Sequence, residues 1–299
     1  MNSSNPKISI ILPAFNESAV IGDVVTRVMA VLDEVGDPFE ILVIDDGSSD
    51  DTAVQAASAG ARLVHHPYNI GNGAAIKTGI RNARGQILVM LDADGQHPPN
   101  KIPHLIAPIG PYDMVVGART TSSESAWHRD LANGVYNRLA SYVSGSRIED
   151  LTSGFRAIKA DLARSFVYLL PNTFSYPSTI TLATVRTGRA LVYIPIQARK
   201  RVGKSKISLL RDGLRFLMII IKIATFFSPL KVFVPVSILM FLAGFGYGLF
   251  KVLILSTPYG PTSAMLMTMS VVVFMVGLVA EQVAQLRFDR SEIFDNEEH

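Results

Sequence analysis

The chain has 299 residues, of which 48% are hydrophobic and 18% are charged, whereas soluble domains typically have about 25% charged residues. This composition excludes a disordered chain, a collagen-like chain and a nucleic-acid-binding arm, and the lack of cysteine excludes a disulfide scaffold, a Cys-ligated metal centre and a cysteine nucleophile. The net charge is only +3, so any strong positive field must come from local clustering.

The part of the chain before residue 200 alternates short apolar runs with segments of helical spacing. Strands are expected at Lys7–Leu12, Phe39–Ile44, Ala61–His65, Gln86–Leu91 and Tyr112–Val116. Helices are expected at Ser18–Val35, Asp50–Ala59, Gly73–Arg84 and Trp127–Val143. This alternation predicts an α/β domain with a mostly parallel sheet covered on both faces. Ligands of such sheets bind beyond the carboxyl ends of the strands.

An acidic motif, Asp92-Ala93-Asp94, follows the fourth expected strand directly. Two carboxylates at this spacing can converge on a hard divalent cation, and Mg²⁺ or Mn²⁺ in such a site also binds a diphosphate. Gln96 and His97 follow within reach, either as further ligands or as groups that orient the ligands. The plain alternative is a pair of solvated aspartates in a turn.

Two further polar segments lie at the same predicted edge of the sheet. Asp45-Asp46 ends the second expected strand, where a carboxylate can accept hydrogen bonds from a base or a ribose, or belong to the cap of the next helix. The segment Asn69–Gly73 has glycines that let backbone approach a ligand closely. It lacks G-x-G-x-x-G and the P-loop lysine, which excludes a Rossmann or a Walker site.

Two long uncharged runs lie near the end of the chain. Residues 232–280 contain one charged side chain, Lys251, where about nine would be expected at the chain-wide fraction. Because a membrane-spanning helix needs about 20 apolar residues, we expect two spans, Leu230–Leu255 and Ser263–Leu286, joined by a polar turn with two prolines. The alternative is a hairpin buried in the core of a soluble domain.

Basic residues set the expected orientation of these spans. They flank the two runs on their outer sides and are absent from the turn, with Arg211, Arg215, Lys222 and Lys231 before the first span and Arg287 and Arg290 after the second. The positive-inside rule therefore places both ends, and the domain before them, in the cytoplasm. The apolar run Ile8–Phe15 is too short for the core of a signal peptide.

The densest basic stretch immediately precedes the first span. Arg186–Lys231 contains eleven Lys and Arg and one acid, a net charge of +10, which leaves −7 for the rest of the chain. Ile207–Phe227 mixes apolar and basic residues in the manner of an amphipathic helix at a bilayer surface. These cations either anchor the chain to anionic lipid or bind the phosphate of a lipid substrate, and composition does not separate the two.

Four motifs carry a family resemblance, namely Leu12-Pro13-Ala14-Phe15-Asn16-Glu17, Asp45-Asp46-Gly47-Ser48, Asn69-Ile70-Gly71-Asn72-Gly73 and Asp92-Ala93-Asp94-Gly95-Gln96-His97-Pro98. Together they resemble family 2 glycosyltransferases of the GT-A fold. More closely, they resemble polyprenyl-phosphate glycosyltransferases such as dolichol-phosphate mannose synthases and bacterial undecaprenyl-phosphate glucosyl- or aminoarabinosyltransferases. Asp150–Arg156 and Gly203–Lys206 resemble further motifs of that subgroup, whereas Asn72 departs from it, since many relatives have lysine there.

The resemblance covers the whole chain and implies roles for individual residues. The nucleotide would be held by Pro13, Phe15, Glu17, Asp45, Asp46, Gly71, Asp92 and Ala93. Mg²⁺ or Mn²⁺ would be held by Asp92, Asp94 and Gln96. The acceptor phosphate would be bound by Arg119, Arg129, Asn133, Lys200 and Arg201, with the alignment of the last two ambiguous. The catalytic residues would be Asp94, Arg119, Arg129 and Arg201.

The chemistry of a lipid-phosphate acceptor agrees with these roles. A phosphate monoester with a second pKa near 6 is largely ionised at neutral pH, so its attack needs no strong general base. It needs cations that clamp two mutually repelling phosphates, and the candidates are Arg119, Arg129, Arg156 and Arg201. We therefore expect Asp150 to orient or pair with an arginine. The lack of Q-x-x-R-W, a motif of processive synthases, indicates one sugar per cycle.

The expected function is transfer of a single sugar from a UDP- or GDP-sugar to undecaprenyl or dolichyl phosphate at the cytoplasmic face of the cell membrane. The family resemblance implies inversion at the anomeric carbon. One alternative is a different acceptor, such as a diacylglycerol or the end of a polysaccharide. Another is a non-catalytic membrane scaffold with a degenerate transferase domain.

The expected organisation is a catalytic domain over residues 1–206, an amphipathic juxtamembrane helix over 207–229, a two-helix transmembrane hairpin over 230–286 and a cytoplasmic tail over 287–299. The tail from Ser291 is polar and acidic, which predicts disorder. Relatives imply a homo-oligomer, and Gly244, Gly246 and Gly248 would permit close packing of helices.

Overall fold

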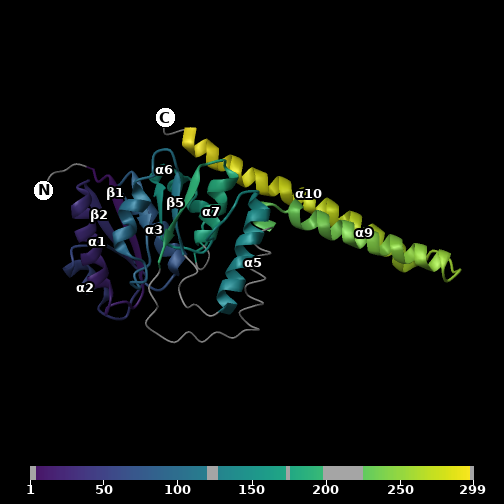
Figure 1. Ribbon diagram of the computed structural model, residues 1–299, viewed down its shortest axis with the longest axis horizontal. Helices are drawn as coiled ribbons and strands as arrows, with labels where there is room; N and C mark the ends of the chain where they lie inside the picture. Colours follow the sequence, from purple (N-terminus) through teal and green to yellow (C-terminus); the bar gives the residue numbers. More distant parts are fainter. Residues whose placement is uncertain (1–4, 120–126, 173–175, 198–224, 297–299) are drawn as a thin grey trace. The chain divides into compact units, whose positions relative to one another are not determined.

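The computed structural model describes residues 5–119, 127–172, 176–197 and 225–296, and within helical residues 127–133 and 287–296 it describes the backbone alone. The chain forms two compact units (Figure 1). The first contains Met1–Ser141 and Ser146–Lys206, and the second contains Tyr142–Gly145 and Ile207–His299. The juxtamembrane helix predicted over 207–229 lies mostly outside the described residues.

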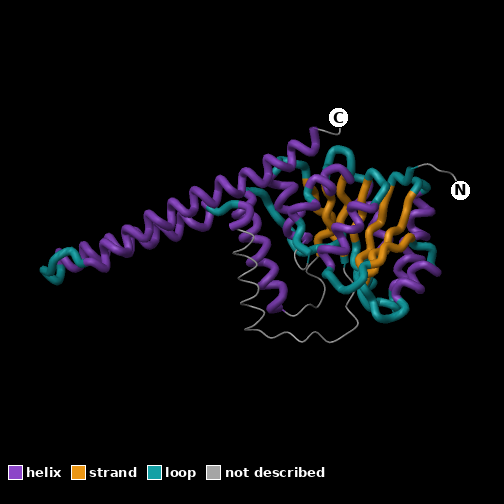
Figure 2. The backbone as a smooth tube through the Cα atoms, turned by 180° about the vertical axis from the view of Figure 1, so that it is seen from behind, coloured by secondary structure: helices purple, strands orange, loops and turns teal. Residues whose placement is uncertain are grey.

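The first unit is built on a seven-stranded sheet with the strand order β3-β2-β1-β4-β6-β5-β7 (Figure 2). The strands are β1 Ile8–Ala14, β2 Phe39–Asp45, β3 Arg62–His65, β4 Ile87–Met90, β5 Met114–Arg119, β6 Arg156–Lys159 and β7 Leu191–Ile196. All neighbours are parallel except β6, which runs antiparallel to both β4 and β5. The predicted mostly parallel sheet and its five predicted strands are confirmed, whereas β6 and β7 were not predicted.

Helices connect and cover these strands. They are α1 Ile21–Val35, α2 Thr52–Ser58, α3 Asn72–Asn82, α4 Ile102–Ile106, α5 Trp127–Ser144, α6 Ala160–Ser165 and α7 Tyr176–Arg186, with short 3-10 turns at Pro99–Lys101 and Val167–Leu169. The four helices predicted for this part of the chain are all present. In α1 the glycine that follows, Gly36, adopts a left-handed conformation with φ of 77° and its N–H bonds back to Leu32, which ends the helix.

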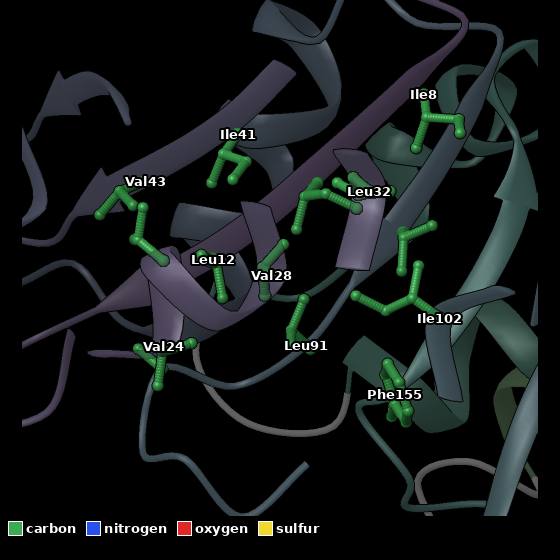
Figure 3. Close-up of a cluster of buried hydrophobic side chains, with 14 of the residues drawn as sticks. Ile8, Leu12, Val24, Val28, Leu32, Ile41, Val43, Leu91, Ile102 and Phe155 are labelled. Carbon is green, nitrogen blue, oxygen red and sulfur yellow. The ribbon is translucent and has the colours of Figure 1, made fainter. Parts of the chain in front are cut away.

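Both faces of the central strand β1 are covered, so every one of its residues is buried. On one face, Ile8, Ile10 and Leu12 pack in a cluster with residues of α1 and α4 (Figure 3). On the other face, Ile11 contacts α3 at Gly79, where a Cβ would collide with the isoleucine side chain. This double cover fixes the positions of the strand ends, from which the polar motifs extend.

The second unit is a helical hairpin of α9 Leu230–Leu253 and α10 Pro261–Asn296. The segments Leu230–Leu253 and Pro261–Leu286 have hydropathies of 2.0 and 2.2 and bury only 17% of their most apolar windows. By length and composition, both are able to cross a membrane. α10 continues to Asn296, so the prediction of a disordered tail from Ser291 is wrong over most of that segment. The helix of the second span continues through the acidic residues as far as Asn296.

Small residues allow the two helices of the hairpin to approach closely. A Cβ added to Gly244 would lie 2.8 Å from Leu266, and one added to Gly277 would lie 2.6 Å from Phe233. Gly248 faces the ring of Tyr259. The glycines at 244 and 248 therefore serve packing within the hairpin, while among the described residues nothing lies within 4 Å of a Cβ built at Gly246.

Candidate active site

The candidate site lies along one edge of the sheet, where β1, β2, β4 and β5 end. Because β6 is antiparallel to its neighbours, its beginning reaches the same edge. The segment Asp150–Phe155, just before β6, therefore meets the acidic motif after β4, although the two are far apart in the sequence. The structure thus brings together most of the described residues that the sequence predicted for donor, metal and acceptor.

A tight turn holds Asp94 and Gln96 together after β4. Asp94 Oδ1 accepts the backbone N–H of Gln96 at 3.1 Å, and the side-chain amide of Gln96 donates to Asp94 Oδ2. Gly95 between them has a φ of 72°, a left-handed conformation that glycine adopts without strain. Within the described residues, no donor forms a hydrogen bond to the Gln96 amide oxygen, so this oxygen would be available as a ligand.

Asp92 presents a carboxylate with few neighbours that stabilise its charge. Burial raises its pKa, the charge of Asp94 raises it further, and His97 and Arg119 act in the opposite direction. The side chain still has 37% of its surface exposed. Two adjoining carboxylates, one of them desolvated, favour the binding of a cation.

The residues of this motif fit a divalent metal ion. The donors are oxygens, as Mg²⁺ and Mn²⁺ prefer. Within the described residues there is no group of three or more His, Cys, Asp and Glu side chains placed to hold a metal. Asp92, Asp94 and Gln96 would therefore supply only part of a coordination shell. This is typical of Mg²⁺ sites completed by water and substrate phosphate.

Asp45 and Asp46 are both buried, and the surrounding backbone engages their carboxylates. Asp45 Oδ1 accepts the Ser48 N–H at 3.0 Å, and its Oδ2 lies 2.7 Å from His65 Nδ1. Asp46 accepts the N–H groups of Ile70 at 3.1 Å and Gly71 at 2.8 Å. The second carboxylate thus holds the glycine loop at the start of α3.

A buried histidine completes the support of Asp46. His66 Nδ1 lies 2.7 Å from Asp46 Oδ1, and its Nε2 lies 2.9 Å from Thr78 Oγ1 in α3. His66 therefore has a structural role, because its two ring nitrogens join Asp46 to α3. The contact between His66 and Thr78 was not predicted. The sequence signal for it was the pair His65-His66 at the end of the third expected strand, which pairs with the strand that ends at Asp45.

The loop after β1 is fastened to the loop after β2. Asn16, with a φ of 54°, donates its N–H to Ser48 Oγ and accepts the Ser49 N–H, both at 2.9 Å. The Glu17 N–H donates to Thr52 Oγ1 at 2.8 Å. These bonds present the ring of Phe15, 43% exposed, at the edge of the site. Such a ring is able to stack against a nucleobase.

Arg119 at the end of β5 is paired with Asp150. Its Nε donates to Asp150 Oδ2 at 2.8 Å and its Nη2 donates to Oδ1 at 2.9 Å, a bidentate pair. Burial alone would raise the pKa of Asp150, but the hydrogen bonds and charge of Arg119 hold it below its usual value. The same pairing raises the pKa of Arg119. Asp150 therefore orients an arginine, as expected from the sequence.

Arg156 does not have the role that the sequence allowed. It was one of four candidates for a phosphate clamp, but its side chain is fully buried. The guanidinium donates to the backbone carbonyls of Ser153 and Pro177 and, at 3.0 Å, to Thr181 Oγ1. It therefore joins β6 to α7 inside the fold, because β6 lies between β4 and β5 and its face is covered.

Four predicted acceptor residues cannot be placed. The side chains of Arg129 and Asn133 in α5 lie outside the described residues, as do Lys200 and Arg201 entirely. Their roles stay predictions.

Comparisons with known proteins agree with this architecture. Residues 9–166 match the family described as "Glycosyl transferase family 2", and residues 228–286 match "GtrB C-terminal hairpin". The fold resembles glucosyl-3-phosphoglycerate synthase from Mycobacterium tuberculosis, crystallised with Mn²⁺, uridine diphosphate and phosphoglyceric acid, with 24% identity and a TM-score of 0.58 over 72% of this chain and 76% of that one. A structure titled only as a mycobacterial protein has 23% identity and a TM-score of 0.59, covering 74% of each chain. These likenesses confirm the GT-A fold.

Proposed function

Because the chain belongs to glycosyl transferase family 2, we propose that it transfers a single sugar from a UDP- or GDP-sugar to a polyprenyl phosphate, with inversion at the anomeric carbon. Sugar transfer from a nucleotide donor is the activity of the family. The acceptor and the membrane anchor are our proposals, and the match of residues 228–286 to the GtrB C-terminal hairpin supports both.

The observation that carries this proposal is the meeting of an acidic motif and a fixed arginine at one edge of the sheet. Asp92, Asp94 and Gln96 offer oxygen ligands, while Arg119 is held by Asp150 close enough for its charge to lower the pKa of Asp92. Such an arrangement suits a metal-bound diphosphate on one side and a second phosphate on the other. A scaffold without catalysis has no need of it.

On the donor side, the chain's residues bind and orient the nucleotide. Phe15 would stack on the base, and Glu17, Asp45 and Ala93, which lie at or just after the ends of β1, β2 and β4, would contact the base and ribose. Pro13 and Gly71 shape the backbone beside them, and Asp46 fixes Gly71. Asp92, Asp94 and Gln96 would hold Mg²⁺ or Mn²⁺, which when bound neutralises charge on the departing diphosphate.

On the acceptor side, Arg119, Arg129, Asn133 and Lys200 or Arg201 would bind the lipid phosphate. This phosphate is its own nucleophile, because its second pKa near 6 leaves it mostly ionised at neutral pH. The protein therefore has to overcome repulsion between two anions rather than remove a proton. Arg119 with its bidentate Asp150 partner is a rigid cation for this purpose.

We further propose that α9 and α10 span the cell membrane, with the catalytic unit and the C-terminus in the cytoplasm. The basic residues on the outer sides of both spans and the lack of basic residues in the turn support this orientation. A lipid phosphate in the cytoplasmic leaflet would then lie on the same side of the membrane as the catalytic unit. We propose a homo-oligomer on the strength of the family resemblance alone.

A panel assay tests the function. The purified full chain is incubated with Mn²⁺, radiolabelled UDP- and GDP-sugars, and undecaprenyl or dolichyl phosphate, and lipid extracts are analysed for a labelled glycolipid. We expect one product carrying one sugar, and loss of that product in Asp94→Ala. Competition with a diacylglycerol identifies a different acceptor if the label moves to it. Nucleotide-dependent thermal stabilisation without any product would instead indicate a non-catalytic binding protein.

A further inference from the structure

The imidazole of His97 lies beside the Asp92 carboxylate, with 3.8 Å between His97 Nε2 and Asp92 Oδ2. It lies three residues after Asp94, and its side chain is only 9% exposed. In sequence terms it is either a metal ligand or a group that orients one. The contacts of its two ring nitrogens distinguish the two.

The first nitrogen of the ring determines where its proton lies. The backbone N–H of Asp92 donates to His97 Nδ1 at 3.1 Å. A nitrogen that accepts a hydrogen bond carries no proton, so the neutral imidazole carries its proton on Nε2. A protonated Nε2 has no lone pair for a metal ion.

The second nitrogen faces the carboxylate. Nε2 lies 3.8 Å from Asp92 Oδ2, which is longer than a hydrogen bond but close enough for the N–H dipole to favour one position of the oxygen. His97 therefore contacts Asp92 twice, through its backbone and toward its side chain.

Packing fixes the plane of the ring. The imidazole stacks on Phe155, with ring centroids 5.2 Å apart and an angle of 14° between the planes, and Phe155 is itself fully buried. The neighbouring Gly154 leaves room for Asp92, because a Cβ there would lie 3.1 Å and 3.2 Å from its two carboxylate oxygens. Phe155 and Gly154 thus frame the same carboxylate from the segment before β6.

We propose that His97 is a positioning residue that orients the Asp92 carboxylate through its Nε2–H, and that it is not itself a ligand of the metal. This assignment rests on the proposed function, in which Asp92 holds Mg²⁺ or Mn²⁺. Groups that orient metal ligands in this way typically change metal affinity by about 10- to 100-fold when they are replaced.

Two isosteric replacements separate the roles of the two nitrogens. The oxygen of asparagine occupies the place of Nδ1, so His97→Asn keeps the bond to the Asp92 backbone and loses the donor at Nε2. The amide nitrogen of glutamine reaches the place of Nε2, so His97→Gln keeps that donor. Both variants lose the stacking of the imidazole ring on Phe155. Each is therefore a control for the effect of that loss in the other.

Mn²⁺ binding to the full chain in detergent with UDP is measured by electron paramagnetic resonance, with Asp94→Ala as the negative control. We expect the affinity to fall about tenfold or more in His97→Asn and to stay close to the wild-type value in His97→Gln. Wild-type affinity in His97→Asn, or an equal loss in both variants, would overturn the assignment. A wild-type protein that binds no Mn²⁺ with UDP would overturn the proposed function as well.

A spectroscopic readout on the wild-type protein is independent of any folding defect in the variants. Electron spin-echo modulation of bound Mn²⁺ detects nitrogen that is directly coordinated. We expect no imidazole coupling. A coupling that disappears in His97→Gln would make His97 a ligand and refute the positioning role.

Discussion

Replacing Asp46 with asparagine tests whether this carboxylate builds the loop beside it or contacts the nucleotide. The side chain is 4% exposed. It accepts three hydrogen bonds, from Ile70, Gly71 and His66. Asparagine has the same shape but only one accepting oxygen, so its amide group would face at least one of these donors. The substitution therefore removes an acceptor without creating a cavity.

The magnitude follows from the bonds that are lost. Leaving the Gly71 N–H without its acceptor costs about 1–3 kcal/mol. The remaining bonds change from charged to neutral, which weakens them by about 1 kcal/mol in all. The total is about 2–4 kcal/mol. For a domain of this size, that corresponds to a fall in melting temperature of about 5–15 °C.

The assay compares thermal melting of the full chain in detergent with and without UDP and Mn²⁺, at one fixed scan rate. Asp46→Asn should have a lower melting temperature even without ligand. Its affinity for UDP should also fall, because the loop at Gly71 loses a hydrogen bond that holds it in place. Asp51→Asn, an exposed neighbour without a side-chain cap bond, is the matched control and should change stability by less than about 0.5 kcal/mol. Unchanged melting without ligand combined with lost UDP affinity would refute our reasoning and make Asp46 a direct nucleotide contact.

Three further results are expected. Asp150→Asn should lower turnover about 10- to 100-fold with UDP affinity retained, because Arg119 loses its bidentate partner and its position. Disappearance of the acidic limb of the pH–rate profile in this variant would instead identify Asp150 as a base. Gly154→Ala should destabilise the chain by about 1–3 kcal/mol and weaken Mn²⁺ binding, since its Cβ would press on the Asp92 oxygens; unchanged Mn²⁺ affinity would contradict this. Chelation by EDTA should abolish glycolipid formation, and Mn²⁺ or Mg²⁺ should restore it; activity that persists after exhaustive chelation would contradict the metal assignment.

Hydrophobic pattern and turn chemistry predicted most of the fold. The strands from β1 to β5 are short apolar runs that end in polar motifs, and α1 has clean helical spacing, so local sequence and burial agree. β6 and β7 escaped prediction for a physical reason. Arg156 and Lys159 bound β6, and Tyr193 and Pro195 interrupt β7, so neither reads as an apolar run. Tertiary pairing with β5 stabilises both strands.

The sequence predicted which residues belong to the candidate site better than it predicted which of them contact one another. Placement at strand ends was enough to identify Asp92 and Asp94, because all parallel strands end at one edge. The pairing of Arg119 with Asp150 depends on the direction of β6. Because β6 was not predicted, its direction was not predicted either. The sequence therefore indicated that Asp150 pairs with an arginine, but it did not identify Arg119 as that arginine.

The hydrogen bonds of each carboxylate separate roles that the sequence presents as equal. Asp46 has both oxygens occupied by donors of the fold, so a ligand would have to displace bonds that hold the loop at Gly71. Within the described residues, no donor forms a hydrogen bond to the Asp92 carboxylate, and His97 Nε2 lies 3.8 Å from its Oδ2, while burial raises the pKa of Asp92. A partly exposed carboxylate whose charge few groups of the fold stabilise would be stabilised by a bound cation. The fold therefore uses Asp46 to hold its loop and leaves the Asp92 oxygens open, which agrees with the proposed role of Asp92 as a metal ligand.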